Sequence, residues 1–380
     1  MKLESLKISP LRYDYIASVE MTISHMNLDN LKAIKRLDKK NVAASINNLP
    51  RQLTASWEIA KKTKIPPAFG KAKNIIFCGM GGSNLASELL KRVFGTKIRV
   101  PFIMVRGYKL PGFAGKNSLV VIDSYSGNTE ETVSCLEQAL KLKAKIICIA
   151  SGGKIELLAK RNKLTLFKLN AALNPSGQPR YDVGSQLGTA LSIFSKLKFI
   201  SISDKEIAAA ADKLLEMGQN LSPSAKQNFN FSKQLAQRLI GQNLYIVGAE
   251  HLSANAHILA NQINESAKQL AIPYRIPELN HHLLEALTFP KRTVKETAFI
   301  FLVSPNYSER IMKRFITTKK ILDQKGIANF SMTAKSSGAL NQALEILAIG
   351  SWVSFYLAMA NGIDPAEIPW VDLFKRELEK

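Results

Sequence analysis

The chain has 380 residues, of which 46% are hydrophobic and 22% are charged, so it has the composition of a globular protein and room for two or three domains. Its net charge of +22 is scattered in small groups without a nucleic-acid motif, which favours a solvated basic surface over a nucleic-acid partner. The first residues lack the apolar core of a signal peptide, and no apolar run reaches the roughly 20 residues that cross a bilayer, so we expect a cytoplasmic protein without a membrane partner.

The first half of the chain predicts helices followed by an α/β unit. Residues 1–70 form the predicted N-terminal helical segment, with a break at Leu49-Pro50. Residues 71–200 alternate apolar strand-like runs with helical stretches, which predicts a parallel sheet covered by helices on both faces. The expected strands are 74–78, 100–105, 119–123, 145–150 and 165–169, and helices are expected near 130–143 and 155–160.

The second half repeats this pattern. A helical connection over 201–240 leads into a second α/β unit over 241–380. That unit has predicted strands at 243–248, 297–303 and 328–332, a long helix from the first strand through Lys268, and an apolar helix over 339–360. The sequence therefore predicts two similar α/β units in tandem, with weak internal symmetry.

Two loops of the first unit have the character of an anion site. Gly79-Met80-Gly81-Gly82-Ser83-Asn84 joins a strand to a helix, where glycines allow close approach and the helix start offers free N–H groups. Ser83 is expected to cap that helix and to donate to a phosphate oxygen. The loop at 123–129 adds the hydroxyls of Ser124, Ser126 and Thr129 beside a second helix start. Together they predict a phosphate site at the carboxyl ends of the strands.

Other cofactor and metal sites are not indicated. The first loop lacks the later glycine of a dinucleotide fingerprint, and no GxxxxGK[ST] loop for ATP is present. His251 and His257 lack the i, i+4 spacing of a zinc helix, and the three cysteines have no metal-ligand spacing. We expect no cofactor and no metal, and we expect Cys78 and Cys148 to be buried, reduced thiols.

The loop sequences FCGMGGSNLASELL and IDSYSGNTEETVSCLEQA resemble the sugar isomerase (SIS) domain family. This resemblance implies a flavodoxin-like three-layer αβα fold and assigns phosphate binding to Gly82, Ser83, Ser124, Ser126 and Thr129. The whole chain is similar to the bifunctional phosphoglucose/phosphomannose isomerases, which contain two SIS domains. Four further stretches carry this narrower resemblance: 264–268 (NESAK), 277–281 (PELNH), 179–181 with Gly184, and 361–375.

The resemblance implies a metal-independent aldose–ketose isomerase acting on glucose 6-phosphate, with mannose 6-phosphate as a second substrate to be tested. Glu265 would move the proton between C1 and C2, and Arg180 would stabilise the enediolate. His281, supplied across a homodimer interface, would open the sugar ring, and Lys375 would assist ring opening or hold the substrate.

Each of these side chains also has a purely structural interpretation. Glu265 could form a surface ion pair with Lys268, three residues further along a helix. His281 could be a residue of a helix cap, Arg180 an exposed loop charge, and Lys375 a solvated lysine of a charged terminal helix.

The sequence departs from the family at three places. His282-Leu283 stands where the family has Asn-Glu, the loop over 174–180 is longer, and Ala366 replaces a threonine. The last change puts activity on both C2 epimers in question. Two other functions stay open: a non-catalytic sugar-phosphate sensor, and the isomerising half of an amidotransferase, for which no N-terminal cysteine nucleophile is present.

Overall fold

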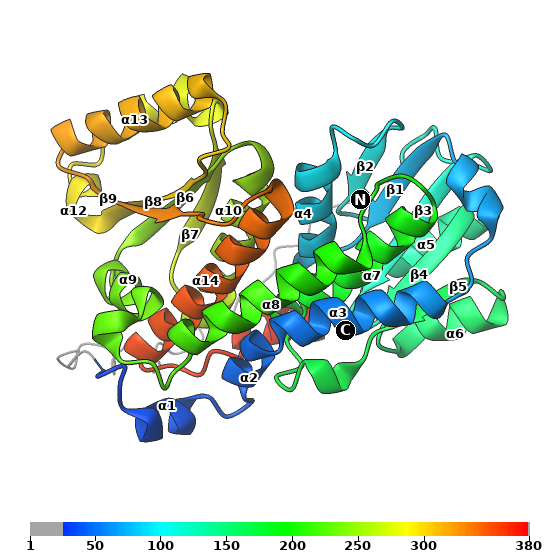
Figure 1. Cartoon of the computed structure of the whole chain (residues 1–380), viewed down its shortest axis with the longest axis horizontal. Coiled ribbons are helices and arrows are strands. Elements are labelled where there is room, and N and C mark those ends of the chain that lie inside the picture. The colour runs from blue at the N-terminus through cyan, green and yellow to red at the C-terminus, as the bar shows by residue number, and fades with distance from the viewer. Residues whose placement is uncertain (1–25, 379–380) are drawn as a thin grey trace, which may run out of the picture.

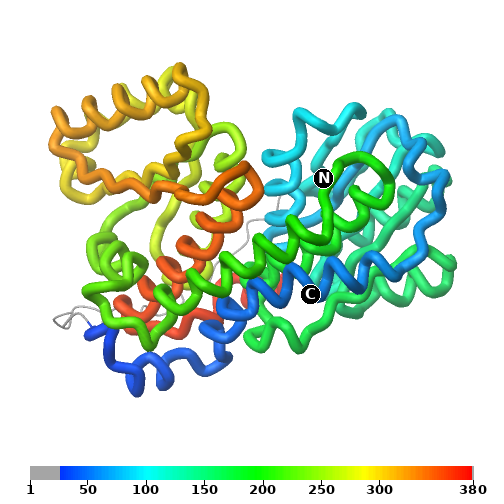
Figure 2. Tube along the Cα trace, viewed as in Figure 1, coloured from blue at the N-terminus to red at the C-terminus, as the bar shows by residue number. Residues whose placement is uncertain are grey.

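The computed structural model describes residues 26–378. Two parallel sheets stand side by side, each flanked by helices, and the chain completes the first sheet before it begins the second (Figures 1 and 2). The predicted α/β class with two tandem units is therefore confirmed. Residues 1–25 of the predicted N-terminal helical segment lie outside the described residues.

The first sheet has five parallel strands in the order β2-β1-β3-β4-β5. Apolar residues of α5 (Glu130–Lys141) and α6 (Gly153–Arg161) cover one face, and those of α4 (Leu85–Phe94) and α7 (Val183–Lys196) cover the other. The central strand β3 is buried along its whole length, as its continuous apolar run predicts. The strands are β1 (Asn74–Cys78), β2 (Phe102–Val105), β3 (Ser118–Ser124), β4 (Lys145–Ala150) and β5 (Thr165–Lys168).

The second sheet has four parallel strands in the order β7-β6-β8-β9. The sequence did not predict β7, which has Pro273 at its centre. Proline cannot donate to a sheet ladder, but β7 is an edge strand, where that loss is tolerated. The strands are β6 (Asn243–Gly248), β7 (Ala271–Arg275), β8 (Thr297–Val303) and β9 (Ala328–Thr333), and the main flanking helices are α10 (Ser253–Gln262), α13 (Glu309–Gln324) and α14 (Ala339–Ala360).

Helix α14 corrects the expectation that no segment could span a membrane. By length and composition this helix could do so, because its most apolar window has a mean hydropathy of 1.6. Within the fold, however, 94% of that window is buried. Trp352, Phe355 and Tyr356 pack against one another on this helix with ring centroids 5.5 Å apart. Its apolar character therefore reflects its position as a core helix of the second unit.

The N-terminal helices connect the two units. The break predicted at Leu49-Pro50 lies one residue earlier, at Asn48 between α2 (Val42–Asn47) and α3 (Leu49–Lys62), and α3 packs along α7 of the first unit. A Cβ at Gly184 would lie 2.8 Å from the Gln52 side chain, and one at Gly188 would collide with the Leu53 carbonyl oxygen. Glycine at these two positions allows the helices to approach closely.

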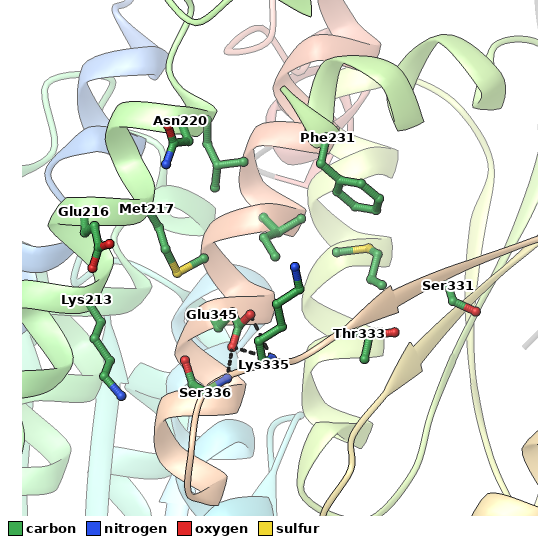
Figure 3. Close-up of a pocket in the computed structure, with 13 residues that line it drawn as sticks. Lys213, Glu216, Met217, Asn220, Phe231, Ser331, Thr333, Lys335, Ser336 and Glu345 are labelled. Atoms are coloured by element: carbon green, nitrogen blue, oxygen red, sulfur yellow. Dashed lines mark hydrogen bonds between the residues drawn. The ribbon is translucent and has the colours of Figure 1, made fainter. Parts of the chain in front are cut away.

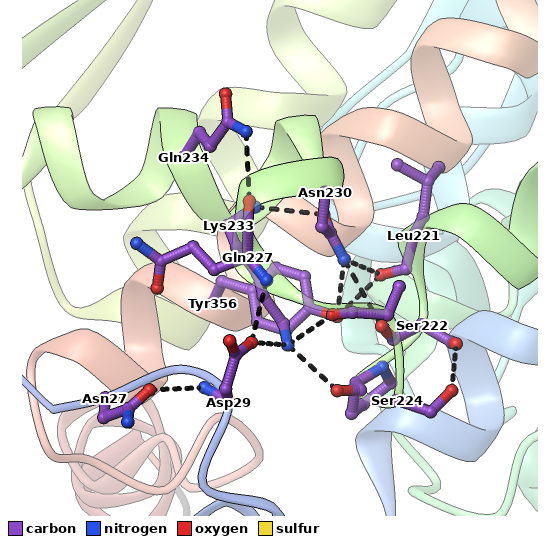
Figure 4. Close-up of polar contacts among 12 residues, drawn as sticks. Asn27, Asp29, Leu221, Ser222, Ser224, Gln227, Asn230, Lys233, Gln234 and Tyr356 are labelled. Atoms are coloured by element: carbon purple, nitrogen blue, oxygen red, sulfur yellow. Dashed lines mark hydrogen bonds and ion pairs between the residues drawn. The ribbon is translucent and has the colours of Figure 1, made fainter.

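An ion pair with a buried lysine attaches the start of the described chain to the helical connection before the second unit (Figure 4). Lys233 of α9 (Phe231–Leu239) is fully buried, and its ammonium lies 2.9 Å from a carboxylate oxygen of Asp29. The same ammonium donates to the carbonyls of Pro223 and Ala225 at 2.9 and 2.8 Å. The hydrogen bond from Lys233 lowers the pKa of Asp29. Three acceptors offset the cost of burying this charge.

The remaining helices include the 18-residue α8 in the middle of the chain and four shorter ones. They are α1 (Leu31–Leu37), α8 (Asp204–Leu221), α11 (Leu283–Ala286), α12 (Thr293–Glu296) and α15 (Pro369–Leu378).

Candidate active site

The first glycine loop is shaped by what packs against it. It leaves β1 at Cys78, passes through a 3-10 turn at Gly81–Asn84 and enters α4. Gly81 has a φ of +49°, a conformation that suits glycine. A Cβ at Gly82 would lie 2.7 Å from Pro179 Cβ and 2.8 Å from the Arg180 nitrogen. Glycine is therefore required at position 82, because the turn that carries Arg180 rests directly on the loop.

Ser83 connects the two predicted phosphate loops and does not cap α4. Neither the 3-10 turn nor α4 has a side-chain cap hydrogen bond, so the capping expectation is wrong. Instead, the buried Ser83 hydroxyl accepts from the backbone N–H of Tyr125 at 2.8 Å. The hydroxyl accepts from a loop N–H instead of a helix N–H, and this bond holds the two loops in contact.

The second loop is organised by its own hydroxyls. The Ser124 and Thr129 hydroxyls lie 3.0 Å apart, and Ser124 accepts from the Gly127 N–H at 3.1 Å. Ser126 is exposed and accepts from the Asn128 N–H at 3.3 Å. The predicted phosphate residues Ser124, Ser126 and Thr129 thus lie on one short turn at the start of α5.

A third loop supports this turn from behind. Gly127 has a φ of +71°, and a Cβ there would collide with the Gly152 carbonyl oxygen. The Asn128 amide oxygen accepts from the Lys154 N–H at 2.9 Å. The segment Gly152–Lys154 therefore has a structural role, which explains its glycines without a ligand.

Arg180 is fully buried and is bonded to both units. Nε donates to Ser266 Oγ at 2.9 Å, and Nη1 donates to Gln178 Oε1 at 2.7 Å. Nη2 donates to the carbonyls of Pro365 and Ala366 at 2.7 and 3.1 Å. The alternative of an exposed loop charge is therefore wrong. These bonds fix the guanidinium plane, a condition for stabilising developing negative charge.

Glu265 lies against this arginine, although the two residues are 85 positions apart. Arg180 Nη1 donates to Glu265 Oε2 at 3.0 Å, and the Glu265 side chain remains 29% exposed. The predicted helix through Lys268 instead ends at Gln262, and Glu265 is carried by a π-helical turn at Ile263–Ala267. Such turns redirect side chains out of a regular helix. The pair combines a fixed cation with a carboxylate that a ligand can reach.

Lys268 makes different contacts from those that the surface ion pair requires. It has a φ of +49°, and its ammonium donates to the Ser266 and Asp364 carbonyls at 3.2 and 2.7 Å. The residue is exposed as a whole, but partial burial of the ammonium and the nearby charge of Arg180 lower its pKa to about 8. Lys268 therefore ties the Glu265 turn to the segment around Asp364 and Ala366.

Two buried carboxyl groups lie beneath the phosphate loops, and sequence reasoning missed both. Burial raises the pKa of Asp123 well above its usual value, and the charge of Asp182 adds to this. Burial also raises the pKa of Asp182 to about 7, partly offset by a hydrogen bond from Ser185. With its amide nitrogen facing acceptors, Gln186 donates to the Ser83 carbonyl at 3.2 Å and to Asp123 Oδ2 at 3.3 Å. Asp123 directly precedes Ser124 and Asp182 lies two residues after Arg180, and this closeness to predicted site residues was the available signal.

Ser266 and Tyr181 are further contacts that the sequence did not single out. The Tyr181 hydroxyl donates to Ser266 Oγ at 2.7 Å and lies 3.0 Å from the Ser354 hydroxyl. Each follows a predicted site residue in the chain, Tyr181 after Arg180 and Ser266 after Glu265. They hold the arginine from the side of α14.

His281 and Lys375 are not brought to Arg180 and Glu265 within this chain. His281 ends a 3-10 turn at Glu278–His281 after β7, and Lys375 lies on α15; both are exposed. Neither side chain has a hydrogen bond or ion pair to any of residues 26–378. The adjacent His282 instead lies against Tyr274, with ring centroids 6.0 Å apart.

A cavity of about 640 Å³ lies elsewhere, between α8, α9, β9 and α14 (Figure 3). Met217, Phe231 and Met332 supply apolar lining. Glu345 is held at its edge by the N–H groups of Lys335 and Ser336, at 2.7 to 3.0 Å. None of the predicted site residues lines this cavity, so its size does not mark the candidate site.

Comparisons with known proteins agree with this architecture. Residues 68–173 match the model of the SIS domain, and residues 228–378 match that of the bacterial phospho-glucose isomerase C-terminal SIS domain. Among solved structures, a hypothetical protein of Thermus thermophilus has the same fold with a TM-score of 0.70 at 15% identity, covering 92% of this chain and 93% of the other.

Two curated relatives align along almost their whole length. The bifunctional phosphoglucose/phosphomannose isomerase of Aquifex aeolicus is 31% identical over 329 residues, covering 85% of this chain and 94% of the relative. The protein of the same name from Caldicellulosiruptor bescii is 29% identical over 341 residues, covering 88% of this chain and 98% of the relative.

Proposed function

The chain belongs to the family of bifunctional phosphoglucose/phosphomannose isomerases, and from this premise we propose that it interconverts glucose 6-phosphate and mannose 6-phosphate with fructose 6-phosphate. The Arg180–Glu265 pair, at 3.0 Å beside the glycine loop, carries the proposal. Aldose–ketose isomerisation needs a group that moves a proton between C1 and C2 and a cation for the enediolate. These two side chains supply both.

The substrate phosphate binds to the two loops at the carboxyl end of the first sheet. Gly82 and Ser83 contribute from one loop, and Ser124, Ser126 and Thr129 contribute from the other. Hydroxyls and backbone N–H groups stabilise the phosphate without neutralising it, so the product can leave. Because the Arg180 turn rests on Gly82, the phosphate loop and the catalytic pair are positioned by one contact.

Glu265 acts as the proton shuttle and Arg180 as the electrostatic stabiliser. In the free enzyme the Glu265 carboxylate accepts a hydrogen bond from the guanidinium at 3.0 Å, and in the proposed reaction it accepts the C2 proton of the open-chain aldose. As the proton leaves, negative charge develops on the adjacent oxygens, where the buried guanidinium acts in a medium of low dielectric constant. Transfer of the hydroxyl proton from O2 to O1 and return of the carbon-bound proton to C1 give the ketose.

Ring opening is assigned to His281 of a second subunit, with Lys375 as its assistant or as a substrate ligand. The exposure of both side chains within one chain supports an origin across an interface. Helix α15 supports it as well, because Trp370 and Phe374 are 75% and 61% exposed and no residue of the helix is buried. A homodimer would cover this apolar face.

The division of the chain follows from the same proposal. Residues 71–200 form the phosphate-binding SIS domain, 201–240 form a connection, and 241–380 form the SIS domain that contributes Glu265 and His281. The cytoplasm is the proposed location, since it holds the sugar phosphates of central metabolism.

The deciding experiment is fructose 6-phosphate turnover in EDTA, with glucose 6-phosphate and mannose 6-phosphate quantified separately. Formation of both products is expected, and their ratio reports how Ala366 and His282 affect the choice of C2 epimer. Light scattering of the same sample gives the subunit number, for which two is expected. A folded dimer that binds fructose 6-phosphate and forms neither product would overturn the proposal.

A further inference from the structure

The two sheets approach each other through their edge strands, and a buried carboxylate lies between them. Strand β2 is at the edge of the first sheet and β7 at the edge of the second. Arg106 directly follows β2, and Arg275 ends β7. Glu88 of α4 lies between these two arginines and is only 2% exposed. Arginines from different units therefore meet at one carboxylate.

Glu88 is bonded by three basic side chains. Arg106 Nη2 lies 2.5 Å from Oε2, and Arg275 Nη2 lies 2.6 Å from Oε1. The third is His257 of α10, whose Nδ1 is 2.6 Å from Oε2. Burial alone would raise the pKa of Glu88, but the hydrogen bond and charge of His257 and the charges of the two arginines outweigh it and lower the pKa to about 2. The carboxylate is ionised at neutral pH.

The positive charge around Glu88 exceeds what one carboxylate neutralises. Lys91 and Arg92 lie one turn further along α4, close enough that Arg106 and Arg275 help to lower their pKa values, with burial as the largest cause. These four side chains, Lys91, Arg92, Arg106 and Arg275, are called the basic cluster below. Three of its four charges are uncompensated by Glu88, an arrangement that attracts anions.

Most donors of the basic cluster are also unused. Each guanidinium has five N–H donors, but Arg106 and Arg275 each direct only Nη2 to Glu88. Their side chains are 41% and 44% exposed. Over residues 26–378, Lys91 and Arg92 have no hydrogen bond or ion pair to a side chain. Solvent-facing guanidinium forks from two different units are geometrically suited to one oxyanion held between them.

We propose that the basic cluster is a second anion site, which binds the phosphate groups of a small metabolite between the two units. It is separate from the catalytic site, since none of its residues bonds to Arg180, Glu265 or the phosphate-loop hydroxyls. Its ligand carries at least two negative charges, because a singly charged ion would leave the cluster repulsive.

Ligand binding at the basic cluster affects the phosphate loop. Helix α4, which carries Glu88 and two members of the cluster, begins at Leu85, directly after the Gly81–Asn84 turn. A ligand that bridges Arg106 and Arg275 fixes the second unit against this helix. We therefore expect the site to be regulatory, with its ligand changing the KM for the sugar phosphate.

Calorimetric titration of the full-length protein with inorganic pyrophosphate tests this inference. Two ions per chain are expected for the wild type, one at the catalytic loops and one at the basic cluster. Ser124→Ala should weaken the catalytic site selectively. Arg106→Gln with Arg275→Gln should weaken the other site at least tenfold, since charge-assisted hydrogen bonds to the ligand are lost. Arg36→Gln with Arg51→Gln removes the same charge from exposed helix positions and should change neither site.

Lys91→Gln with Arg92→Gln provides a second variant that leaves the bonds of Glu88 intact. It should fold and should also weaken the second site. One pyrophosphate per wild-type chain, or second-site affinity unchanged in both double variants, would overturn the proposal. So would loss of the dimer in the Arg106/Arg275 variant together with a wild-type dimer that binds no second ion, because the cluster would then be a subunit contact.

Discussion

The two units repeat the same strand–glycine–turn connection, but the second carries a carboxylate where the first carries a glycine. Strands β1 and β6 both begin with asparagine, at Asn74 and Asn243, and position 81 of the first corresponds to position 250 of the second. Gly81 has a φ of +49° and Glu250 has a φ of +42°. The backbone turns in the same way, although one turn carries no side chain and the other carries a carboxylate.

That carboxylate lies where an external anion would bind. Glu250 Oε1 accepts from the Ser308 hydroxyl at 2.9 Å and from its N–H at 3.4 Å, and Ser308 is the residue before α13. The helix dipole favours negative charge at this position. The second unit thus supplies its own anion, and Leu252 replaces the hydroxyl of Ser83. A shared fold does not imply a shared site, and here the two units differ in the side chain that their equivalent turns carry.

The largest expected effect is the difference in kcat between the Glu265 variant and the Glu250 variant. Glu265→Gln should lower kcat by about 10²- to 10⁴-fold, the usual contribution of a positioned acid–base group, while phosphate-dependent substrate binding survives. Glu250→Gln, the matched control in the second unit, should leave kcat within about twofold. Steady-state kinetics with fructose 6-phosphate measure both. Loss of substrate binding in the Glu265 variant would indicate a structural role for that residue.

Smaller effects are expected from the loop hydroxyls. Ser124→Ala removes a hydroxyl from the phosphate loop and should raise the KM for fructose 6-phosphate about tenfold, with a smaller change in kcat, since a hydrogen bond to a charged group is worth about 1.5 to 3 kcal/mol. Ser308→Ala, which removes the hydroxyl that donates to Glu250 in the second unit, should leave KM unchanged. Equal KM values for the two variants would contradict the assignment of phosphate binding to the first unit.

The comparison extends to the residues beneath the loops. Ser118 pairs with Asn74 as Thr297 pairs with Asn243, so the buried Asp123 corresponds to the apolar Leu302. Asp123 and its neighbour Asp182 make the first unit sensitive to pH.

Asp182 has a pKa of about 7 in the folded state and about 3.9 when unfolded, so the folded state holds the extra proton between these values. Stability should therefore fall as pH rises from about 4 through 7, by on the order of 4 kcal/mol from this group. Asp182→Asn should flatten the decline, as measured by denaturant unfolding at pH 5 and pH 8. A slope equal to that of the wild type would show that Asp182 does not titrate in this range.

The smallest expected effect follows from removing the Glu250 side chain in the second unit. Glu250→Gly removes the internal carboxylate and suits the positive φ at this position. Inorganic phosphate should then raise the melting temperature of this variant by a few degrees more than that of the wild type, through binding to the folded state. Identical phosphate-dependent shifts would show that Glu250 does not occupy an anion site.

The sequence predicted those features that depend on neighbouring residues. Apolar runs located most strands, Leu49-Pro50 located a helix break to within one residue, and glycine with hydroxyl spacing located both loops. Features that depend on distant contacts were missed. The sequence did not predict β7 because Pro273 argues against a strand. An edge strand tolerates proline, but neighbouring residues do not show which strand lies at an edge. The contacts of Arg180 with Glu265, and of Glu88 with Arg275, join residues 85 and 187 positions apart, so only the fold reveals them.

The contact between Gly82 and the Arg180 turn fixes the distance between two parts of the candidate site. One part is the loop that we propose to hold the substrate phosphate, and the other is the Glu265 carboxylate that we propose to act on C1 and C2. Because the turn that carries Arg180 packs directly on Gly82, and Arg180 donates to Glu265, the separation of these two parts is fixed by the same residues. From the proposed assignments we therefore expect sugar phosphates to be selected by the number of carbons between the phosphate and the carbonyl, whatever the configuration of their hydroxyls.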